Sequence, residues 1–240
     1  MAKQRVLWVT GGGSGMGAAS AEAAARDGWT VVLSGRRVDR LEQVAATITA
    51  SGGTAAVLPL DAADPAAVAS ARDTVLERFG RLDAVVLAAG LNAPRRRWDD
   101  QSLPDFRAIV DTNLTAVVAV VDAALPALRE SGGVVVVVSS YAGWSFQPGA
   151  GVAYSASKTA LGSVVRSLNQ QEAHHGVRAT HLCPGDVATD FLDQRPSVPD
   201  AAARSVMLQP EDIARAVSFV LEAPSYMRVD ELVVSPVSQR

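Results

Sequence analysis

The stretch Thr10-Gly-Gly-Gly-Ser-Gly-Met-Gly17 decides the fold of this chain. It joins the apolar run 6–10, which predicts a buried strand, to the alanine-rich run 15–27, which predicts a helix. Glycines at positions 11, 15 and 17 let the backbone turn tightly and come close to a pyrophosphate at the helix N-terminus. A glycine-rich turn alone is weak evidence, but one placed between an N-terminal strand and a helix predicts a dinucleotide site.

The rest of the chain repeats this alternation of β-rich and helical runs, which is typical of βαβ units and a parallel sheet. The five valines at 134–138 show no polar alternation, as expected of a strand covered by helices on both faces. Without a repeat or a low-complexity linker, the sequence predicts one domain over residues 1–240. We expect strands at 6–10, 30–34, 55–59, 84–88, 134–139, 178–182 and 232–235, and helices at 15–27, 38–51, 66–79, 104–130, 154–175 and 211–222.

Composition excludes several classes of protein. A 48% hydrophobic and 20% charged chain with a net charge of −3 is ordinary for a globular protein, and it argues against a nucleic-acid or anionic-membrane partner. No apolar run is expected to span a bilayer, and the apolar run after the N-terminus is too short for a signal sequence. Cys183 is the only cysteine, so we expect no disulfide, no metal site and a reducing, cytoplasmic location.

Tyr154 and Lys158 are four residues apart, a spacing that places a phenol and an ammonium on one face of a helix. A tyrosine has a pKa near ~10, so poising it near neutrality takes about three units, or roughly 4 kcal/mol. A lysine charge in a dry cleft supplies much of that. A chance pairing on a helix surface is the alternative, and the spacing by itself does not decide between them.

The motifs Thr10-Gly11-x-x-x-Gly15-x-Gly17, Asn113, Ser140, Tyr154-x-x-x-Lys158 and Pro184-Gly185 occur together in this order. In this combination the chain resembles the short-chain dehydrogenases/reductases, in their shorter, single-domain branch. The resemblance covers essentially the whole chain. It implies an α/β fold: a Rossmann-type, doubly wound sheet of seven parallel strands in the order 3-2-1-4-5-6-7, with helices on both faces.

The resemblance also implies the catalytic roles. Tyr154 would be the general acid in reduction and the general base in oxidation, and Lys158 would lower the tyrosine pKa and hold the nicotinamide ribose. Ser140 would hydrogen-bond the substrate oxygen, with Ser139 as its rival. Asn113 would kink its helix and hold a water beside Lys158, although its spacing alone fits a helix-surface amide.

Cofactor choice depends on the end of the second strand, where Ser34-Gly35-Arg36-Arg37 offers two guanidinium groups and no carboxylate. This favours NADP(H) over NAD(H), unless the arginines are merely solvated at a helix start. The cofactor contacts implied are Gly11, Gly13, Ser14, Gly15, Met16, Gly17, Arg36, Arg37, Asp61, Ala62, Ala89, Gly90, Tyr154, Lys158, Pro184, Gly185, Val187 and Thr189. Among them, Asp61 would meet the adenine, and the loop from Pro184 to Thr189 would cover the nicotinamide.

Two segments depart from the family pattern. Leu87-Ala88-Ala89-Gly90 stands where Asn-Asn-Ala-Gly is common, which removes two amide side chains that usually brace neighbouring strands. The C-terminal residues 229–236 lack the usual diglycine, which bears on subunit contacts.

The substrate side is less defined. Residues 190–208 are the expected lid, and Trp144, Phe146 and Phe191 are candidates for an apolar pocket or for the core. The run Arg95-Arg96-Arg97 either attracts an anionic substrate or is solvated. His174 and His175 end a helix and His181 is isolated in a strand, so none is expected to bind a metal.

Together these features predict an NADP(H)-dependent oxidoreductase that acts on a carbonyl or secondary alcohol of a small molecule. The alternatives are a 3-oxoacyl-thioester reductase and a non-catalytic NADP(H)-binding sensor or scaffold. The resemblance further suggests a homodimer or homotetramer built on the helices at 104–130 and 154–175.

Overall fold

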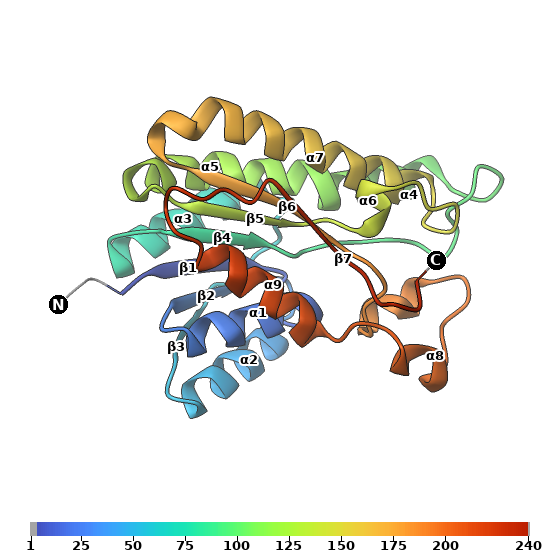
Figure 1. Cartoon of the computed structure of the whole chain (residues 1–240), viewed down its shortest axis with the longest axis horizontal. Coiled ribbons are helices and arrows are strands. Elements are labelled where there is room, and N and C mark those ends of the chain that lie inside the picture. The colour runs from blue at the N-terminus through green and yellow to red at the C-terminus, as the bar shows by residue number, and fades with distance from the viewer. Residues whose placement is uncertain (1–3, 240) are drawn as a thin grey trace.

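A seven-stranded parallel sheet runs through the computed structural model, which describes residues 4–239 (Figure 1). The strand order is β3-β2-β1-β4-β5-β6-β7, as the family resemblance predicts. The strands are β1 (Val6–Thr10), β2 (Thr30–Ser34), β3 (Thr54–Val57), β4 (Ala84–Leu87), β5 (Val134–Val138), β6 (Arg178–Pro184) and β7 (Glu231–Val234).

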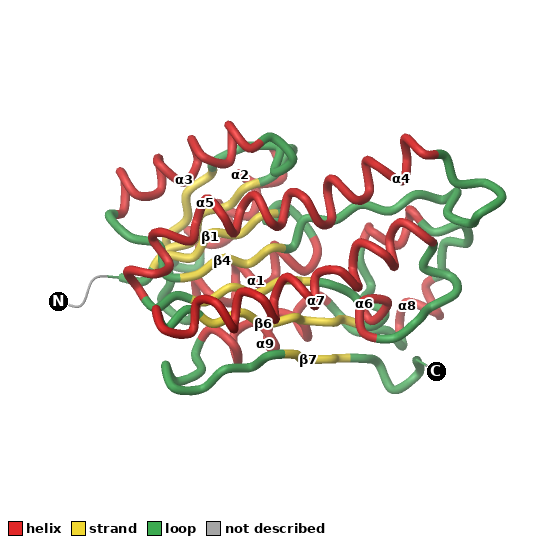
Figure 2. Tube along the Cα trace, turned by 90° about the horizontal axis from the view of Figure 1, so that it is seen from above, coloured by secondary structure: helices red, strands yellow, loops and turns green. Residues whose placement is uncertain are grey.

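Helices cover both faces of this sheet (Figure 2). One core contains side chains of α1 (Gly15–Arg26), α2 (Val38–Ala50) and α9 (Pro210–Leu221), and the other contains those of α3 (Pro65–Phe79), α5 (Ala116–Ser131) and α7 (Val152–Glu172). The shorter elements are α4 (Leu103–Val110), a π-helical turn (Asp111–Thr115), α6 (Tyr141–Trp144), α8 (Ala201–Ser205) and two 3-10 turns (Ala173–His175 and Asp190–Gln194).

The valine strand β5 is buried on both faces of the sheet. Successive side chains point to opposite faces, so Val135 and Val137 enter one core while Val134, Val136 and Val138 enter the other. All five are buried, which leaves no polar face to alternate. The strand therefore reads as a continuous apolar run in the sequence.

Most predicted elements are confirmed, with ends that differ by at most three residues. β1 and β2 have the predicted bounds, and the helix starts at Asp64-Pro65 and Gln209-Pro210 are present: the Asp64 carboxylate accepts from the Ala66 N–H, and Gln209 forms a capping box with Asp212. The short helices α6 and α8 were not predicted, because one-turn helices carry no apolar period to detect.

The predicted helix 104–130 is instead α4, a π-helical turn and α5 in succession. Together, residues 103–131 are long and apolar enough to cross a membrane, with a mean hydropathy of 1.7 over an 18-residue window. The expectation that no segment reaches that length was therefore wrong. In this structure the helix packs against the sheet through Val117, Val120 and Leu128, and such a core helix passes the same test.

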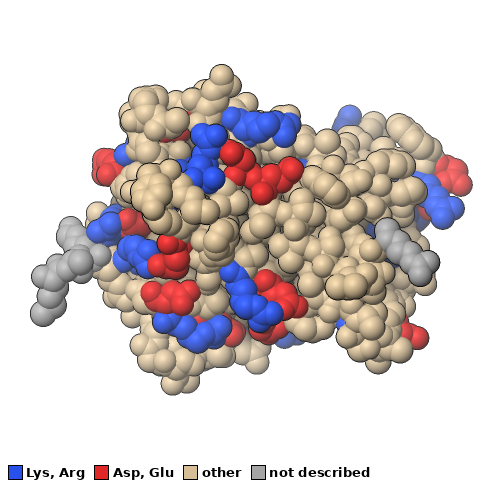
Figure 3. All heavy atoms as spheres, in the orientation of Figure 1, with Lys and Arg blue, Asp and Glu red and all other residues tan. Residues whose placement is uncertain are grey.

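Surface charge agrees with the composition. On the face that Figure 3 shows, lysine and arginine side chains alternate with aspartate and glutamate, and no continuous basic stripe crosses it. Many of these charges are paired, as in Arg5 with Glu222 at 2.8 Å and Arg228 with Asp230 at 2.6 Å. This surface therefore lacks the electrostatic footprint of a nucleic-acid-binding face.

The far end of α7 is fixed to the sheet by a buried amide. Asn169 accepts a hydrogen bond from the Ala179 N–H at 2.7 Å and donates one to the Ala179 carbonyl at 2.8 Å, so it pairs with β6 as a strand would. A second donation, to Asp230 at 3.0 Å, extends the link toward β7. The helix that carries Tyr154 and Lys158 is held in register with the sheet by these bonds.

Candidate active site

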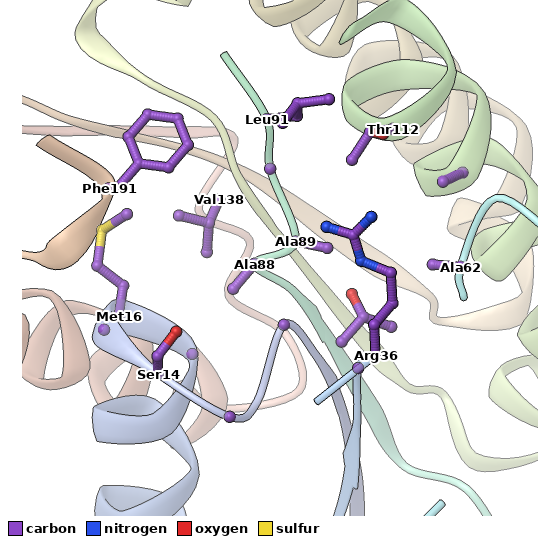
Figure 4. Close-up of a pocket in the computed structure, with 18 of the residues that line it drawn as sticks. Ser14, Met16, Arg36, Ala62, Ala88, Ala89, Leu91, Thr112, Val138 and Phe191 are labelled. Atoms are coloured by element: carbon purple, nitrogen blue, oxygen red, sulfur yellow. The ribbon is translucent and has the colours of Figure 1, made fainter. Parts of the chain in front are cut away.

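A cavity of about 520 Å³ opens at the carboxyl ends of the strands (Figure 4). Its wall is built by residues at the ends of β1, β2, β4 and β5, by the turn into α1, by the first turns of α7, and by the segment 189–194. Parallel pairing brings all of these segments to the same edge of the sheet.

The turn between β1 and α1 is packed too closely for side chains. A Cβ on Gly17 would lie 2.3 Å from the Gly11 carbonyl oxygen, and one on Gly11, whose φ is +70°, would lie 2.6 Å from the Ala89 nitrogen. Ser14, at the start of α1, makes no side-chain cap to the first-turn N–H groups. Those open donors and the glycine cradle fit the pyrophosphate of a dinucleotide.

The two arginines after β2 differ in their contacts. Arg37 donates to the Ser14 hydroxyl at 2.9 Å, which ties the end of β2 to the glycine turn. Arg36 points into the cavity in Figure 4, and it lines the same wall as Ala62 and Ala89. Both line the cavity beside the phosphate cradle.

Most of the predicted cofactor residues line this cavity: Gly11, Gly13, Ser14, Gly15, Met16, Gly17, Arg36, Arg37, Asp61, Ala62, Ala89, Gly90, Tyr154, Lys158 and Thr189. Pro184, Gly185 and Val187 do not line it in this structure. Pro184 ends β6, the Gly185 N–H donates to the Val234 carbonyl at 2.7 Å, and Val187 forms an isolated bridge with Leu208. These three residues support the loop whose end, Thr189, reaches the cavity.

The alanines after β4 fit the glycine turn. The Ala88 side chain would lie 3.3 Å from a Cβ on Gly17, and its N–H donates to the Thr10 carbonyl at 3.1 Å. A small residue at position 88 therefore lets β4 approach the turn. Direct backbone packing takes the place of the contacts that amide side chains at positions 87 and 88 would have made.

Asn113 is fully buried, so the helix-surface alternative is wrong. Its side-chain oxygen accepts from the Leu91 N–H at 2.7 Å, and its amide donates to the Leu91 carbonyl at 2.9 Å and to Ser157 at 3.2 Å. It lies in the π-helical turn Asp111–Thr115, where the extra residue interrupts the regular helical bonds. The turn thus directs an amide inward that a continuous α-helix would place elsewhere.

Lys158 is a buried cation beside this asparagine. Its ammonium donates to the Val138 carbonyl at 3.1 Å and lies 5.7 Å from the centre of the Tyr154 ring. A Cβ on Gly90 would lie 3.8 Å from this ammonium and 3.7 Å from the Asn113 oxygen, so the glycine keeps the space between them open. Burial lowers the pKa of Lys158 to about 8.

Tyr154 faces Ser140, and burial raises the pKa of its phenol. A hydrogen bond with Ser140 opposes this effect on the pKa, as do the charges of Arg195 and Arg96. The Lys158 ammonium, to which the sequence analysis assigned this tuning, lies 5.7 Å from the centre of the ring. It donates a hydrogen bond to the Val138 carbonyl.

The two candidate serines are separated by their partners. The Ser139 hydroxyl is buried and donates to the Lys158 carbonyl at 3.1 Å, which occupies it with the backbone of α7. The Ser140 oxygen accepts from the Ala142 N–H at 3.2 Å, and Ser140 limits the rise in the Tyr154 pKa. Ser139 lines the cavity, but its hydroxyl is bound to the backbone of α7, so Ser140 is the serine that acts on the tyrosine.

Of the three aromatic candidates for a substrate pocket, only Phe191 lines the cavity, 6.0 Å from the Tyr154 ring. Trp144 is 50% exposed and Phe146 is 79% exposed, so they do not form a pocket wall. Trp144 packs edge-on against Tyr141. An isolated aromatic in a loop gives no periodic signal of its orientation, and the sequence could not separate these cases.

His181 is not isolated, contrary to the sequence analysis. Its Nδ1 lies 3.0 Å from the Glu231 carboxylate, and the Cys183 sulfur lies 3.4 and 3.6 Å from its two ring nitrogens. A sulfur nearly equidistant from both nitrogens sits over the ring and not in line with either lone pair. Burial raises the pKa of the thiol to about 12.

The arginine run divides into one buried and two exposed residues. Arg95 is exposed, 3.7 Å from Asp105, and Arg97 is exposed. Arg96 is only 6% exposed and sits against Gly151 at the start of α7. Its guanidinium donates to the Gln194 carbonyl, a contact that could not be predicted because Gln194 lies almost a hundred residues further along the sequence.

The fold and the cavity define a Rossmann-type α/β protein with a dinucleotide site. A sequence model of the short chain dehydrogenase family matches residues 5–199, and the chain belongs to this family. It is an oxidoreductase of a family that binds nicotinamide cofactors and acts on small molecules.

Three similar proteins illustrate the relationship. Sulfoacetaldehyde reductase 2 of Chromohalobacter salexigens is 33% identical over 98% of this chain and 95% of its own length. Glycine betaine reductase ATRR of Emericella nidulans is 32% identical over 97% of this chain, which spans only 19% of that protein. The X-ray structure of an alcohol dehydrogenase from the archaeon Thermococcus sibiricus, complexed with 5-hydroxy-NADP, has a TM-score of 0.89 at 33% identity and covers 99% of this chain and 98% of that chain.

The buried charge of Lys158 predicts a measurable stability cost. Because its pKa is about 8 against an ordinary 10.5, the folded protein binds fewer protons than the unfolded chain between these values. We expect Lys158→Met to raise the free energy of unfolding by about 3 kcal/mol below pH 8, and the gain to disappear as the pH rises toward 10.5.

Urea unfolding of the cofactor-free protein from pH 7 to 10.5 measures this difference. Gln170→Met, on the exposed side of the same helix, is the control and changes the free energy of unfolding by less than about 0.5 kcal/mol. A destabilised Lys158→Met protein at pH 7 would show that the Val138 contact outweighs the burial cost.

Proposed function

We propose that this protein is an NADP(H)-dependent oxidoreductase that interconverts a carbonyl compound and a secondary alcohol, with Tyr154 as the acid and base. One observation carries the proposal: Tyr154 and Lys158 line the same cavity as the glycine turn, and Ser140 acts on the Tyr154 phenol through a hydrogen bond. A phenol, a hydroxyl and an ammonium beside a dinucleotide cradle are the groups that carbonyl reduction needs.

Each side chain has a separate role in the proposed reaction. The Tyr154 hydroxyl donates its proton to the carbonyl oxygen during reduction, and Ser140 holds that oxygen where negative charge develops. Lys158 lies beside the ring and holds the ribose hydroxyls, while Asn113 fixes the segment around Leu91 next to it. The nicotinamide supplies or accepts the hydride when it is bound.

Preference for NADP(H) rests on the end of β2. Arg36 and Arg37 line the cavity where the adenosine ribose would lie, and the segment Ser34-Gly35-Arg36-Arg37 contains no carboxylate to repel a 2′-phosphate. The similar alcohol dehydrogenase is complexed with 5-hydroxy-NADP, which supports the same choice. The relative named sulfoacetaldehyde reductase supports a small carbonyl substrate.

Subunit assembly is part of the proposal. We place a homodimer or homotetramer on the outer faces of α4–α5 and α7, where Val118 is 44% exposed and Leu103 is 60% exposed. A sedimentation mass of 25.0 kDa at micromolar concentration would identify a monomer and contradict this assembly. We further propose a reducing, cytoplasmic location, in keeping with a single buried thiol.

Turnover by wild type and Tyr154→Phe tests the catalytic proposal. NADPH oxidation, with NADH alongside, is followed against a panel of ketones, oxo acids, quinones and oxoacyl thioesters. We expect turnover by wild type that falls about 10²- to 10⁴-fold in Tyr154→Phe, because that range is typical of lost acid catalysis. NADPH binding, measured by fluorescence, stays within about twofold.

Other outcomes point to the alternatives. Tight NADPH binding without turnover across the panel would favour a sensor or scaffold. Selective turnover of oxoacyl thioesters would favour the 3-oxoacyl-thioester reductase. Equal turnover by Tyr154→Phe would remove the tyrosine from the mechanism.

Arg36→Asp tests the cofactor preference. Replacing a guanidinium that meets the 2′-phosphate with a carboxylate is expected to weaken NADPH binding about ten- to hundredfold and to improve NADH binding, since charged hydrogen bonds are worth about 1.5–3 kcal/mol. Arg26→Asp makes the same charge change at the far end of α1 and leaves both affinities within about twofold. Unchanged NADPH affinity in Arg36→Asp would assign this arginine to solvent.

A further inference from the structure

The lid segment 190–208 presents one side-chain hydrogen-bond donor to the cavity. Its residues on the cavity wall are Asp190, Phe191 and Gln194. An ionised aspartate only accepts hydrogen bonds and a phenylalanine side chain makes none, whereas a glutamine carboxamide has an acceptor oxygen and two donor N–H groups. Gln194 is therefore the side chain of these three that can donate to a molecule in the cavity.

The oxygen of this carboxamide is already engaged. The Asn92 N–H donates to the Gln194 Oε1 at 2.8 Å. A backbone N–H can only donate, so the oxygen of Gln194 and not its nitrogen has to face Asn92. The Gln194 Nε2 group consequently points away from this bond.

The nitrogen of the same carboxamide is free to bind a ligand. Within residues 4–239, Gln194 Nε2 donates to no protein atom, and the buried side-chain atoms without a partner belong to Gln101 and Arg178 instead. Gln194 Nε2 is thus accessible, on a residue that lines the cavity. Its two N–H groups can therefore bind an acceptor there without breaking a bond of the lid.

Gln194 is held at its backbone as well as at its side chain. Its carbonyl oxygen accepts from the Arg96 guanidinium, which also donates to the Ala93 carbonyl at 2.7 Å. Asn92 is buried, and its side-chain amide donates to the Ala150 carbonyl at 3.1 Å. The lid, the segment after β4 and the loop before α7 are joined in this way. A donor fixed at both ends loses little conformational freedom when it binds a ligand.

The turn that carries Gln194 also contacts the proposed catalytic groups. Phe191, in the same 3-10 turn, has its ring centre 6.0 Å from that of Tyr154. A Cβ on Gly90 would lie 3.9 Å from the Phe191 ring and 3.8 Å from the Lys158 ammonium. This turn therefore lies beside the tyrosine and the lysine, where the carbonyl group of a substrate would bind.

We propose that Gln194 is a specificity-determining residue, whose Nε2 group donates a hydrogen bond to a second oxygen of the substrate. The substrate class is then a carbonyl compound that also carries a neutral acceptor oxygen, such as an oxo ester. The reacting carbonyl oxygen meets Tyr154 and Ser140, and the second oxygen meets Gln194. An alkyl chain in the same place would leave the donor without a partner and bind less well. This inference rests on the proposed oxidoreductase function, since it names the substrate class of the same site.

Chain-matched substrates test the proposal. The kcat/KM with saturating NADPH is compared for methyl acetoacetate and hexan-2-one, and for methyl levulinate and heptan-2-one, which pair an oxo ester with the alkanone of equal chain length. Gln194→Met keeps the length of the side chain and removes the donor. We expect it to lower the ratio of oxo ester to alkanone about three- to tenfold in at least one pair, mainly through KM, as the loss of one neutral hydrogen bond predicts. Comparing this ratio between proteins cancels the intrinsic reactivities of the two carbonyls.

Gln194→Glu separates donation from support of the lid. Its carboxylate can still accept from the Asn92 N–H, but it has no N–H to donate. We expect Gln194→Glu to lower the ratio at least as much as Gln194→Met. A wild-type ratio in Gln194→Glu would show that the residue only supports the lid and would overturn the proposal. Gln170→Met, the same substitution at an exposed position of α7, is the matched control and leaves the ratio within about twofold.

Cofactor affinity excludes a second explanation. If Gln194 held the cofactor, both variants would weaken NADPH binding, which is measured by fluorescence. We expect the NADPH affinity of each to stay within about twofold of the wild type. A loss of about tenfold or more would assign the amide to the cofactor and contradict the proposal.

Binding without turnover separates this inference from the function on which it rests. Dimethyl succinate carries ester oxygens and no ketone, and its binding to the NADPH-loaded protein is followed by saturation-transfer NMR. Binding that both Gln194 variants weaken would support the donor even if no ketone were turned over. Equal binding by all three proteins, or none by the wild type, would contradict it. Turnover of the oxo esters and alkanones with a ratio that neither variant changes would leave the oxidoreductase function intact and remove Gln194 from substrate recognition.

Discussion

The all-parallel pairing of the seven strands is the constraint on which the rest of this structure depends. Parallel strands end at the same edge, so the phosphate turn after β1, the arginines after β2, Gly90 after β4 and Ser139 after β5 are brought together from distant parts of the sequence. The sheet can stay parallel because helices connect each strand to the next and cover the apolar faces of the sheet. The functional groups therefore meet at the edge of the sheet because the apolar middle of the sheet is buried between helices.

Buried positive charge is the second feature on which the structure depends, and burying it costs free energy of folding. Lys158 and Arg96 are both almost fully buried, and burial lowers the pKa of each. Neither is neutralised by a carboxylate: the lysine donates to the Val138 carbonyl and the arginine to three carbonyls of its surrounding loops. A protein selected for stability alone would replace such groups with apolar ones. Lys158 lines the cavity of the proposed active site, whereas Arg96 ties together the loops beside it.

The apolar runs and the glycine turn predicted the parallel sheet and the phosphate end of the cavity, whereas the strand order and the remaining cofactor contacts came from the family resemblance. Asn113 required the family pattern, since a helical amide is buried here only through a π-helical turn that helical periodicity cannot reveal. Arg96 could not be told from Arg95 and Arg97 in a run of three identical residues. Its burial is decided by Gly151 and Gln194, which meet it only after the loops have folded. Trp144 and Phe146 could not be excluded from the pocket for the same reason, because the folded loops decide where these two side chains lie.

The positive charges of Arg195 and Arg96 also affect the protonation state of Tyr154, the proposed acid. Burial keeps the pKa of Tyr154 above its ordinary value, while Ser140, Arg195 and Arg96 limit that rise. In the cofactor-free protein the phenol therefore carries its proton at neutral pH, which is the form that can protonate a carbonyl oxygen. Oxidation of an alcohol needs the phenolate, so it is disfavoured until the pH rises or further positive charge is bound.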